Sequence, residues 1–283
     1  MVKKSERIMV QVTKLEVMQS MLRDLMQEIH KICEENNLTY NLFGGSLLGA
    51  VRHQDIIPWD DDIDITMPRP DYERFKEIIK KEYSEKFDLY DYPRDNYIYP
   101  FAKLCKKNTT LYEDSLKPRY SKLGLYVDIF PVDGIPETDE VQIRKRFYKA
   151  DKYKIRTIYC AAKPVASPVW WKKPFVLVKI LRSAFFGIKG YKYYVKKQIE
   201  ETLRYSYEEC DRVGFVSFGN WGIKGIIDKQ SYLDRRLYKF GQYEFWGIKR
   251  AEDYLTSLYG DYMTPPPENK RTPCHNYRLY IED

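Results

Sequence analysis

Cysteine and histidine are scarce in this sequence, and neither the cysteines nor the histidines lie close to one another along it. The 283 residues include 5 cysteines and 3 histidines, and no two cysteines have the short spacing of a zinc-binding or redox motif. We therefore expect no Cys/His metal site. An odd, scattered set indicates free thiols in a reducing cytoplasm. The five positions are Cys33, Cys105, Cys160, Cys210 and Cys274.

Long apolar segments are also missing. The first residues, MVKKSERIMVQVTKLEV, lack the apolar block of a signal peptide. No uncharged apolar run approaches the roughly 20 residues that cross a bilayer. The chain contains no internal repeat and no low-complexity linker. These absences predict a cytoplasmic protein that does not span a membrane.

The composition supports a folded, basic protein. Hydrophobic residues make up 43% of the chain, 26 residues are tyrosine, and the formal net charge is +7. This charge suits a polyanionic partner, such as a nucleotide, an anionic lipid or a phosphorylated glycan, without choosing among them. We expect no nucleic-acid partner, because the basic residues gather with Trp and Phe rather than in a recognisable nucleic-acid-binding motif.

One stretch, NLFGGSLLGAVRHQDIIPWDDDID at 41–64, organises the chain. Gly44 and Gly45 permit positive φ and let a ligand approach the backbone. Ser46 is a good N-cap for a helix over Leu47–Arg52. Free N–H groups at the start of a helix attract phosphate. The Gly-Gly-Ser turn therefore predicts a phosphate-binding loop.

A run of aspartates follows in what we expect to be extended chain. Alternate side chains of a strand share a face, so Asp62 and Asp64 point the same way while Ile63 and Ile65 enter the core. Like charges crowded on one face oppose each other's ionisation, and a cation relieves the repulsion. Mg²⁺ prefers such oxygen ligands and is held by carboxylates together with substrate phosphates. The acids of the run are Asp60, Asp61, Asp62 and Asp64.

The segments GGSLLGAVRH and IPWDDDIDI together resemble the LicD family of phosphocholine transferases, which is related to the fukutin-type proteins and to the nucleotidyltransferase superfamily. The resemblance is strongest over about 36–135 and recurs in the C-terminal tail. It implies an α/β (α+β) fold, with a nucleotidyltransferase-like mixed sheet flanked by helices, in one catalytic domain over 1–283. The core would comprise 36–135 and 237–283, with a helical insertion at about 140–211.

The stretch LGLYVDIFPVDG at 123–134 carries a further acid. Asp128 interrupts an apolar strand, where a carboxylate is costly without a partner. By resemblance, Asp128 is the third acid of the site. It either completes the metal site or accepts the proton of the attacking hydroxyl, and the sequence leaves both roles open. We interpret Asp133, next to Gly134, as a turn residue.

Several basic residues complete the predicted site. Lys103 lies in the apolar run YIYPFAKL, where the resemblance implies contact with phosphate; the alternative is a surface lysine whose stem lies along apolar neighbours. Arg52 follows the phosphate loop and would touch the donor. The tail YGDYMTPPPENKRTPCH extends the resemblance to Arg271 and His275. These two would close over the donor, and full solvent exposure is the alternative.

Periodicity and turn residues predict the other elements. Apolar residues three and four apart indicate helices, and β-branched and aromatic runs between turn residues indicate strands. The expected helices are Val10–Asn36, one opened by Pro70, Val141–Ile158, Gln198–Asp211 and one that ends at Gly260. The expected strands or extended segments are Tyr40–Phe43, Tyr97–Leu104, Thr109–Tyr112, Leu123–Gly134, Phe215–Trp221 and Leu237–Trp246.

The segment 163–197 mixes aromatic and basic residues. That mixture is typical of the membrane interface, and a basic helix that covers the core is the alternative. We interpret the segment as a peripheral contact with the anionic inner face of the cytoplasmic membrane. Its aromatic, apolar and basic residues include Trp170, Trp171, Phe175, Val176, Phe185, Phe186, Lys172, Lys173, Lys179, Arg182, Lys189 and Lys192.

The resemblance implies phosphoryl transfer from a CDP-linked donor. Mg²⁺ or Mn²⁺ would be held by Asp62, Asp64 and Asp128, with Asp60 as a further ligand, while Gly45 and Ser46 hold the donor phosphates. A sugar hydroxyl of a cell-surface glycan, teichoic acid or lipopolysaccharide precursor attacks the distal phosphorus, and CMP leaves.

CDP-choline is the expected donor, and another CDP-linked phospho-alditol is the alternative. The quaternary ammonium of choline suits a cage of aromatic rings, for which the candidates are Trp59, Tyr97, Tyr99 and Trp221. A metal-dependent glycosyltransferase that uses a nucleotide sugar is the rival reading, because those enzymes also use Asp-x-Asp pairs.

Overall fold

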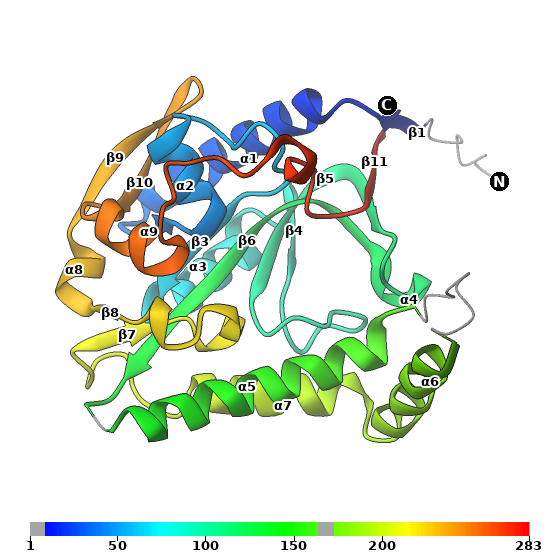
Figure 1. Ribbon diagram of the computed structural model, residues 1–283. Helices are drawn as coiled ribbons and strands as arrows, with labels where there is room; N and C mark the ends of the chain where they lie inside the picture. Colours follow the sequence, from blue (N-terminus) through cyan, green and yellow to red (C-terminus); the bar gives the residue numbers. More distant parts are fainter. Residues whose placement is uncertain (1–8, 138, 164–172, 283) are drawn as a thin grey trace.

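Figure 1 shows the computed structural model, which describes residues 9–137, 139–163 and 173–282. Within these residues, nine strands form one sheet in the order β1-β11-β5-β6-β3-β2, with β4 beside β5, β7 beside β6 and β8 beside β7. Its strands are β1 Met9–Val12, β2 Asn41–Leu42, β3 Asp64–Pro68, β4 Phe87–Tyr90, β5 Ala102–Glu113, β6 Lys122–Ile135, β7 Arg212–Gly214, β8 Ile227–Asp228 and β11 Tyr277–Glu282.

Helices cover this sheet, and a two-stranded hairpin lies beside it. The hairpin joins β9 to β10. These remaining elements are α1 Leu15–Glu35, α2 Gly44–Arg52, α3 Arg69–Glu82, α4 Pro118–Ser121, α5 Glu140–Ala161, α6 Lys173–Gly187, α7 Gly190–Thr202, the 3₁₀ helix η2 Val216–Gly225, α8 Lys229–Leu233, β9 Arg235–Phe240, β10 Tyr243–Ile248, α9 Ala251–Tyr259 and the 3₁₀ helix η3 Glu268–Lys270.

The sheet is mixed, and its centre brings the predicted acids together. β3 runs parallel to β6, whereas β5 runs antiparallel to β6. The registers place Asp64 opposite Asp128 on one side and Lys103 opposite Asp128 on the other. A mixed sheet flanked by helices confirms the predicted fold class.

Helix α1 packs its apolar stripe against the sheet. Leu22, Leu25, Met26 and Ile29 are each at most 1% exposed, and α1 contacts β6. Burial of one such side chain contributes about 1.5–3 kcal/mol, so this stripe fixes the helix firmly. The prediction of a helix here is confirmed, although its first residues instead form β1, which pairs with β11 near the other end of the chain.

Helices α5, α6 and α7 follow β6 and precede β7. Figure 1 shows α5 and α7 side by side below the sheet and α6 at one end of them. The predicted helix Gln198–Asp211 is shifted, because α7 ends at Thr202. Arg146 on α5 explains this end, since its guanidinium donates hydrogen bonds to the carbonyls of Glu201 and Thr202.

Three other sequence predictions were wrong in detail. The two strands expected at Tyr97–Leu104 and Thr109–Tyr112 are one strand, β5, which begins only at Ala102 and has a register shift between Lys106 and Leu111. Phe215–Trp221 was expected to be β-like, but Val216–Gly225 forms a 3₁₀ helix. Three glycines in that segment weaken any strand preference.

Asp133 is a strand residue, and its prediction as a turn residue was wrong. It lies in β6, is 1% exposed, and accepts hydrogen bonds of 2.8 and 3.1 Å from the guanidinium of Arg69. Gly134 follows it because a Cβ there would lie 2.2 Å from the Ser206 carbonyl oxygen. The glycine therefore permits a close approach between chain segments rather than a turn.

Candidate active site

Helix α2 begins at Gly44, which is three residues earlier than an N-cap role for Ser46 requires. Phe43 is the N-cap, and Gly44 has a φ of +52°. Ser46 is buried within the first turn, and its Oγ accepts a hydrogen bond of 2.9 Å from the Asp64 N–H. The N-cap prediction was wrong, but the contact ties the turn directly to the first residue of β3.

Gly45 matters because an acid lies against it. A Cβ at this position would stand 2.9 Å from Oδ2 of Asp60, which is closer than ordinary van der Waals contact. Gln19 fixes the loop that carries Asp60. Its side-chain amide donates hydrogen bonds to the main-chain carbonyls of Ile57 and Asp60. Glycine thus gives the carboxylate its place beside the start of α2.

The acids lie at the N-terminal end of β3 and in the loop before it. β3 begins at Asp64, so residues 60–63 are not strand as expected. Ile63 and Ile65 are fully buried as predicted. The Asp128 N–H donates a 3.0 Å hydrogen bond to the Ile63 carbonyl, which brings β6 against this loop. Asp62 and Asp64 therefore lie on either side of a residue that is fixed to Asp128.

Burial and mutual repulsion shift the titration of these carboxyl groups. Burial, and then the charges of Asp62 and Asp61, raise the pKa of Asp60 to about 7. Burial raises the pKa of Asp62 to about 6, with Asp128 adding to the shift and His275 opposing it. Burial, followed by the charges of Asp62 and Asp128, raises the pKa of Asp64 well above its usual range. The cluster holds more negative charge than its surroundings neutralise.

Lys103 is buried inside the site, so the alternative of a surface lysine was wrong. Its side chain is 3% exposed, and its ammonium group donates a 2.5 Å hydrogen bond to Asp128. The ammonium group also lies 3.5 Å from the ring centre of Tyr126 and 4.8 Å from that of Tyr99. Burial raises the pKa of Asp128, and Lys103 opposes that rise. Lys103 therefore neutralises part of the acid cluster.

The C-terminal segment brings His275 onto the acids. Its main-chain N–H donates a hydrogen bond of 3.1 Å to Oδ2 of Asp61, and its Nδ1 lies 2.9 Å from Oδ1 of Asp61. Nδ1 is 3.7 Å from Oδ2 of Asp62, and the ring stacks on Tyr277 with 4.6 Å between centres. Burial lowers the pKa of His275, but the contact with Asp61 and the charge of Asp62 outweigh it and raise the pKa overall.

Sequence reasoning missed the part that Asp61 plays. Among the described residues, one group of three has ligand atoms within 4.8 Å of one another, and it comprises Asp61, Asp62 and His275. Asp61 is 3% exposed. A buried acid in a run of aspartates needs its own partner, and that requirement was the available signal.

Tyr259, at the end of α9, was also missed. Burial, and then the charges of Asp64 and Asp60, raise the pKa of its phenol. Its hydroxyl would lie 3.6 Å from a Cβ on Gly44. Tyr259 therefore closes the site from the side of the phosphate loop.

Arg52 and Arg271 lie near each other at the edge of the site. Arg52 donates hydrogen bonds of 2.6 Å to the Tyr262 carbonyl and 2.9 Å to Nε2 of His53. Arg271 donates a hydrogen bond of 2.8 Å to the Pro266 carbonyl, and its guanidinium lies 5.4 Å from the ring centre of Trp59. Burial, and then the charge of Arg271, lower the pKa of Arg52. The two arginines thus form a cationic pair at the edge of the site.

The aromatic residues proposed as a choline cage have other contacts. Tyr97 is 1% exposed and donates its hydroxyl to the Phe101 carbonyl at 2.7 Å, so it belongs to the core. Tyr99 faces Lys103, and its hydroxyl donates to Glu113 at 3.0 Å. Trp59 faces Arg271. The side chain of Trp221 lies outside the described part of the chain.

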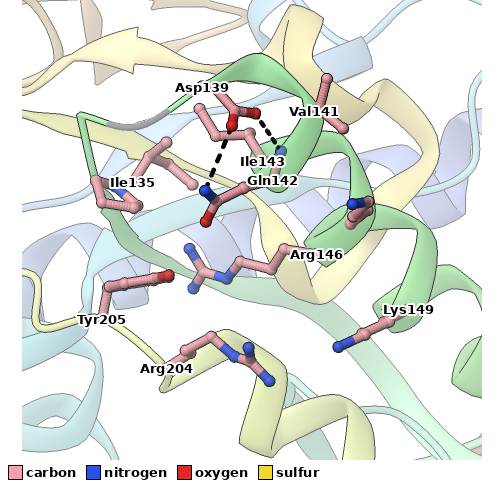
Figure 2. Close-up of a pocket in the computed structure, with 11 residues that line it drawn as sticks. Ile135, Asp139, Val141, Gln142, Ile143, Arg146, Lys149, Arg204 and Tyr205 are labelled. Carbon is pink, nitrogen blue, oxygen red and sulfur yellow. Dashed lines mark hydrogen bonds between the residues drawn. The ribbon is translucent and has the colours of Figure 1, made fainter.

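A polar pocket at the start of α5 is separate from the acids. Figure 2 shows Arg146, Lys149 and Arg204 directed toward it, while Asp139 accepts hydrogen bonds from Gln142 and caps α5. The Arg146 guanidinium is already bonded to three main-chain carbonyls. The cavity is about 390 Å³ and is lined by none of the residues predicted for the site.

Comparison with known proteins identifies the family of this chain. The family model described as LicD/FKTN/FKRP, nucleotidyltransferase domain, matches residues 37–167, which include the phosphate loop and all of the acids. Lipopolysaccharide cholinephosphotransferase LicD of Haemophilus influenzae is 30% identical over 264 residues, which is 91% of this chain and 94% of that protein. The chain belongs to the LicD family. It is therefore an enzyme, a transferase of the LicD phosphotransferase type, as the sequence resemblance predicted.

Two further matches are shorter. Ribitol 5-phosphate transferase FKRP of Homo sapiens is 50% identical over 44 residues, which is 16% of this chain and 9% of that protein. Uncharacterized protein RP689 of Rickettsia prowazekii is 30% identical over 158 residues, or 53% of this chain and 55% of that protein.

Proposed function

We propose that the protein transfers phosphocholine from CDP-choline to a sugar hydroxyl of a lipopolysaccharide or a related cell-surface glycan precursor. The observation that carries this proposal is the long match to the LicD cholinephosphotransferase, which spans nearly the whole of both chains. The gathered acids supply the chemistry that such a transfer needs, because phosphoryl transfer depends mainly on positioning and charge neutralisation.

The carboxylates of the site fit a divalent cation. Asp62, Asp64 and Asp128 offer hard oxygen ligands, and Asp60 stands next to them at Gly45. Burial, followed by the charges of neighbouring carboxylates, raises the pKa values of Asp60, Asp62 and Asp64, and a cation would relieve the repulsion among them. We propose that these residues hold Mg²⁺ or Mn²⁺. When bound, such an ion would offset the negative charge that develops on the donor phosphates during transfer.

The remaining residues position the donor and the acceptor. The start of α2 at Gly45 and Ser46 faces the donor phosphates, and Arg52, Arg271 and His275 bring positive charge to the same edge. Burial raises the pKa of Asp128, and the ammonium group of Lys103 opposes that rise.

The reaction joins the acceptor oxygen to the distal phosphorus. The bond from that phosphorus to the bridging oxygen breaks, and CMP leaves with the bridging oxygen. The hydroxyl proton passes to a carboxylate of the cluster, for which Asp128 is the candidate.

A second donor is favoured by one observation. The 44-residue match to ribitol 5-phosphate transferase is 50% identical. Transfer of a CDP-linked ribitol phosphate is therefore the second candidate. It would require hydroxyl-binding groups in place of an aromatic cage, and three of the cage candidates already have other partners.

Release of CMP by the purified protein tests both candidates. The donors are CDP-choline, CDP-ribitol, CDP-glycerol and CDP-ethanolamine, offered with Mg²⁺ and a lipopolysaccharide precursor extract. EDTA and Asp62→Asn are the controls. Metal-dependent CMP from CDP-choline, absent in the variant, is the expected result. Release from CDP-ribitol alone would select the second candidate, and UDP or GDP release from a nucleotide sugar would replace both with a glycosyltransferase.

A further inference from the structure

Helix α6 exposes large apolar side chains to solvent. Leu181 is 60% exposed, Phe185 67% and Ile188, just after the helix, 81%. Neighbouring α5 adds Ile155 and Ile158, which are both close to half exposed. Contiguous exposed apolar surface of this kind marks an interaction site. We call it the α5–α6 face and define it by Ile155, Ile158, Leu177, Val178, Ile180, Leu181, Phe185 and Ile188.

A groove of about 660 Å³ runs between the two helices within this face. Its walls are mostly apolar and include Ile155, Ile158 and Ile180, and Lys163 and Lys179 also line it. The Lys117 ammonium group closes one side, where it donates to the Cys160 carbonyl and to Ser183 Oγ. An apolar cleft with amines along it matches a molecule that has a hydrocarbon part and a negative charge.

The part of the sequence that carries the α5–α6 face is basic. Between Asp151 and Glu200 the sequence contains no aspartate or glutamate and has 12 lysines and arginines. On α6, Lys179 and Arg182 are exposed, and Lys189 follows the helix. Two copies of such a face would repel each other, whereas anionic lipid head groups would attract it. The charge therefore favours a lipid surface over a second copy of this chain as the occupant.

A chain of contacts leads from the groove to the acids. Ser115 lines the groove, and its hydroxyl donates a hydrogen bond of 2.7 Å to Glu113. Glu113 accepts a hydrogen bond of 3.0 Å from the Tyr99 hydroxyl, and the centre of the Tyr99 ring lies 4.8 Å from the Lys103 ammonium group. Lys103 in turn bonds Asp128. A surface that occupies the groove thus lies a few side chains from the acid cluster.

We infer that the α5–α6 face binds the surface of an anionic lipid bilayer, with α6 lying in the interface. Its apolar side chains enter the boundary between head groups and acyl chains, and its basic side chains meet the phosphates. Among the described residues, no helix is long and apolar enough to cross a membrane. The contact is peripheral, and it goes beyond the proposed transfer reaction.

Sedimentation with lipid vesicles tests this inference on the full-length protein. The vesicles contain phosphatidylcholine alone or phosphatidylcholine with phosphatidylglycerol. We expect the protein to sediment with the anionic vesicles and to stay in solution with the neutral ones. High salt should release part of it, because screened head groups attract the basic residues less.

Two variants separate the apolar and the basic contributions. The triple change Leu181→Ser, Phe185→Ser and Ile188→Ser should weaken vesicle binding by at least roughly tenfold, because three exposed apolar side chains no longer enter the interface. Its matched control replaces exposed apolar residues elsewhere and should bind like the parent protein. The control changes are Val17→Ser, Leu233→Ser and Leu237→Ser.

The charge reversal Lys179→Glu with Arg182→Glu should weaken binding to a similar degree, again roughly tenfold. Lys80→Glu with Lys81→Glu, at exposed positions on α3, is the charge-matched control. Thermal unfolding of each variant shows that the fold is kept, as expected for exposed positions. If the apolar and the charge variants both weaken vesicle binding, the assignment of binding to the α5–α6 face does not depend on a single variant.

Three outcomes would overturn the inference. The parent protein could stay in solution with anionic vesicles, or the triple variant could bind as well as the parent. Alternatively, the parent could sediment as a dimer that the triple variant dissociates, without vesicle binding by either, which would make the face an interface between copies. Asp62→Asn should still bind vesicles, so loss of the transfer reaction and loss of membrane binding remain distinguishable.

Discussion

Lys103 and Asp128 lie opposite each other on β5 and β6 and form a buried ion pair of 2.5 Å at the centre of the acid cluster. The carboxylate also faces Asp64 across the parallel pair of strands. Asp128 is thus held between a cation and another acid. This arrangement makes the lysine a determinant of the charge state of the whole site.

Lys103→Met should lower the free energy of unfolding by about 3–5 kcal/mol at neutral pH, because removal of one partner leaves a buried charge alone. Burial raises the pKa of Asp128 and Lys103 opposes that rise, so the variant shifts this pKa further upward. The loss should therefore be smaller at mildly acidic pH, where Asp128 carries a proton. Urea unfolding in EDTA at two pH values measures it.

The double variant Lys103→Met with Asp128→Asn is the control for this prediction. It removes both charges, so it should recover part of the stability at neutral pH and show little dependence on pH. An equal loss at both pH values in the single variant would show that packing against Tyr126, rather than charge, is what the lysine contributes.

Ser46→Ala removes the acceptor of the Asp64 N–H at the start of β3. We expect it to cost about 1–3 kcal/mol of stability, because a buried donor loses its partner. Transfer activity should fall by more than tenfold, since Asp64 loses its fixed position. Thermal unfolding and CMP release measure the two effects.

Ser121→Ala is the matched control for Ser46→Ala. Ser121 has the same 6% exposure, and its hydroxyl donates to the Pro118 carbonyl at 3.2 Å, at the start of β6. We expect a smaller loss of stability and unchanged kcat. If both serine variants kept full activity, the link between the phosphate loop and Asp64 would have no role in transfer.

Asp61 and His275 should act as a unit, because two hydrogen bonds join them. His275→Gln and Asp61→Asn should each lower kcat/KM by roughly tenfold, and the double variant should lose little more than either single variant. Steady-state CMP release from the four proteins measures the coupling. Losses that multiply in the double variant would show that the two residues act independently.

The sequence could predict Asp62, Asp64 and Asp128, which lie on neighbouring strands or just before them, because their positions follow from local patterns. Asp62 and Asp64 flank a fully buried isoleucine, and Asp128 interrupts an apolar strand. The pairing of β3 with β6 then brings them together. Resemblance to the family added Lys103, and its burial beside Asp128 decided between the two readings of that residue.

The sequence could not predict contacts that the chain makes over long separations. Asp61 and His275 meet across 214 positions, and Tyr259 reaches the phosphate loop from the end of α9. Asp133 resembled a turn residue because it precedes a glycine, but Arg69 from the start of α3 neutralises it inside the sheet. Such pairings depend on how distant elements pack, which spacing along the chain does not contain.

Tertiary contacts also decided where elements end. The apolar pattern gave a helix beyond residue 202, but α7 ends where Arg146 binds its last carbonyls. The first residues of the predicted Val10–Asn36 helix form β1 because they pair with strand β11. Both corrections arise from partners far away in the sequence.

The acid cluster should make the stability of the metal-free protein depend on pH. The pKa of Asp60 is raised to about 7 and that of Asp62 to about 6, so the folded chain binds these protons more tightly than the unfolded chain does. Their contribution is fully present below about pH 4, where unfolded aspartates titrate, and is lost as the pH rises to about 7. In EDTA, Tm should therefore fall between about pH 5 and about pH 8.

Addition of Mg²⁺ should reverse that loss and raise Tm more at about pH 8 than at about pH 5, because ligands must be deprotonated to bind a metal. Differential scanning calorimetry at both pH values, with EDTA or Mg²⁺, measures the change. Asp62→Asn with Asp64→Asn removes two of the repelling charges, so it should flatten the pH dependence and abolish the response to Mg²⁺. A response to Mg²⁺ that survives in this variant would place the metal elsewhere, and a flat pH profile in the parent protein would mean that local cations already neutralise the cluster.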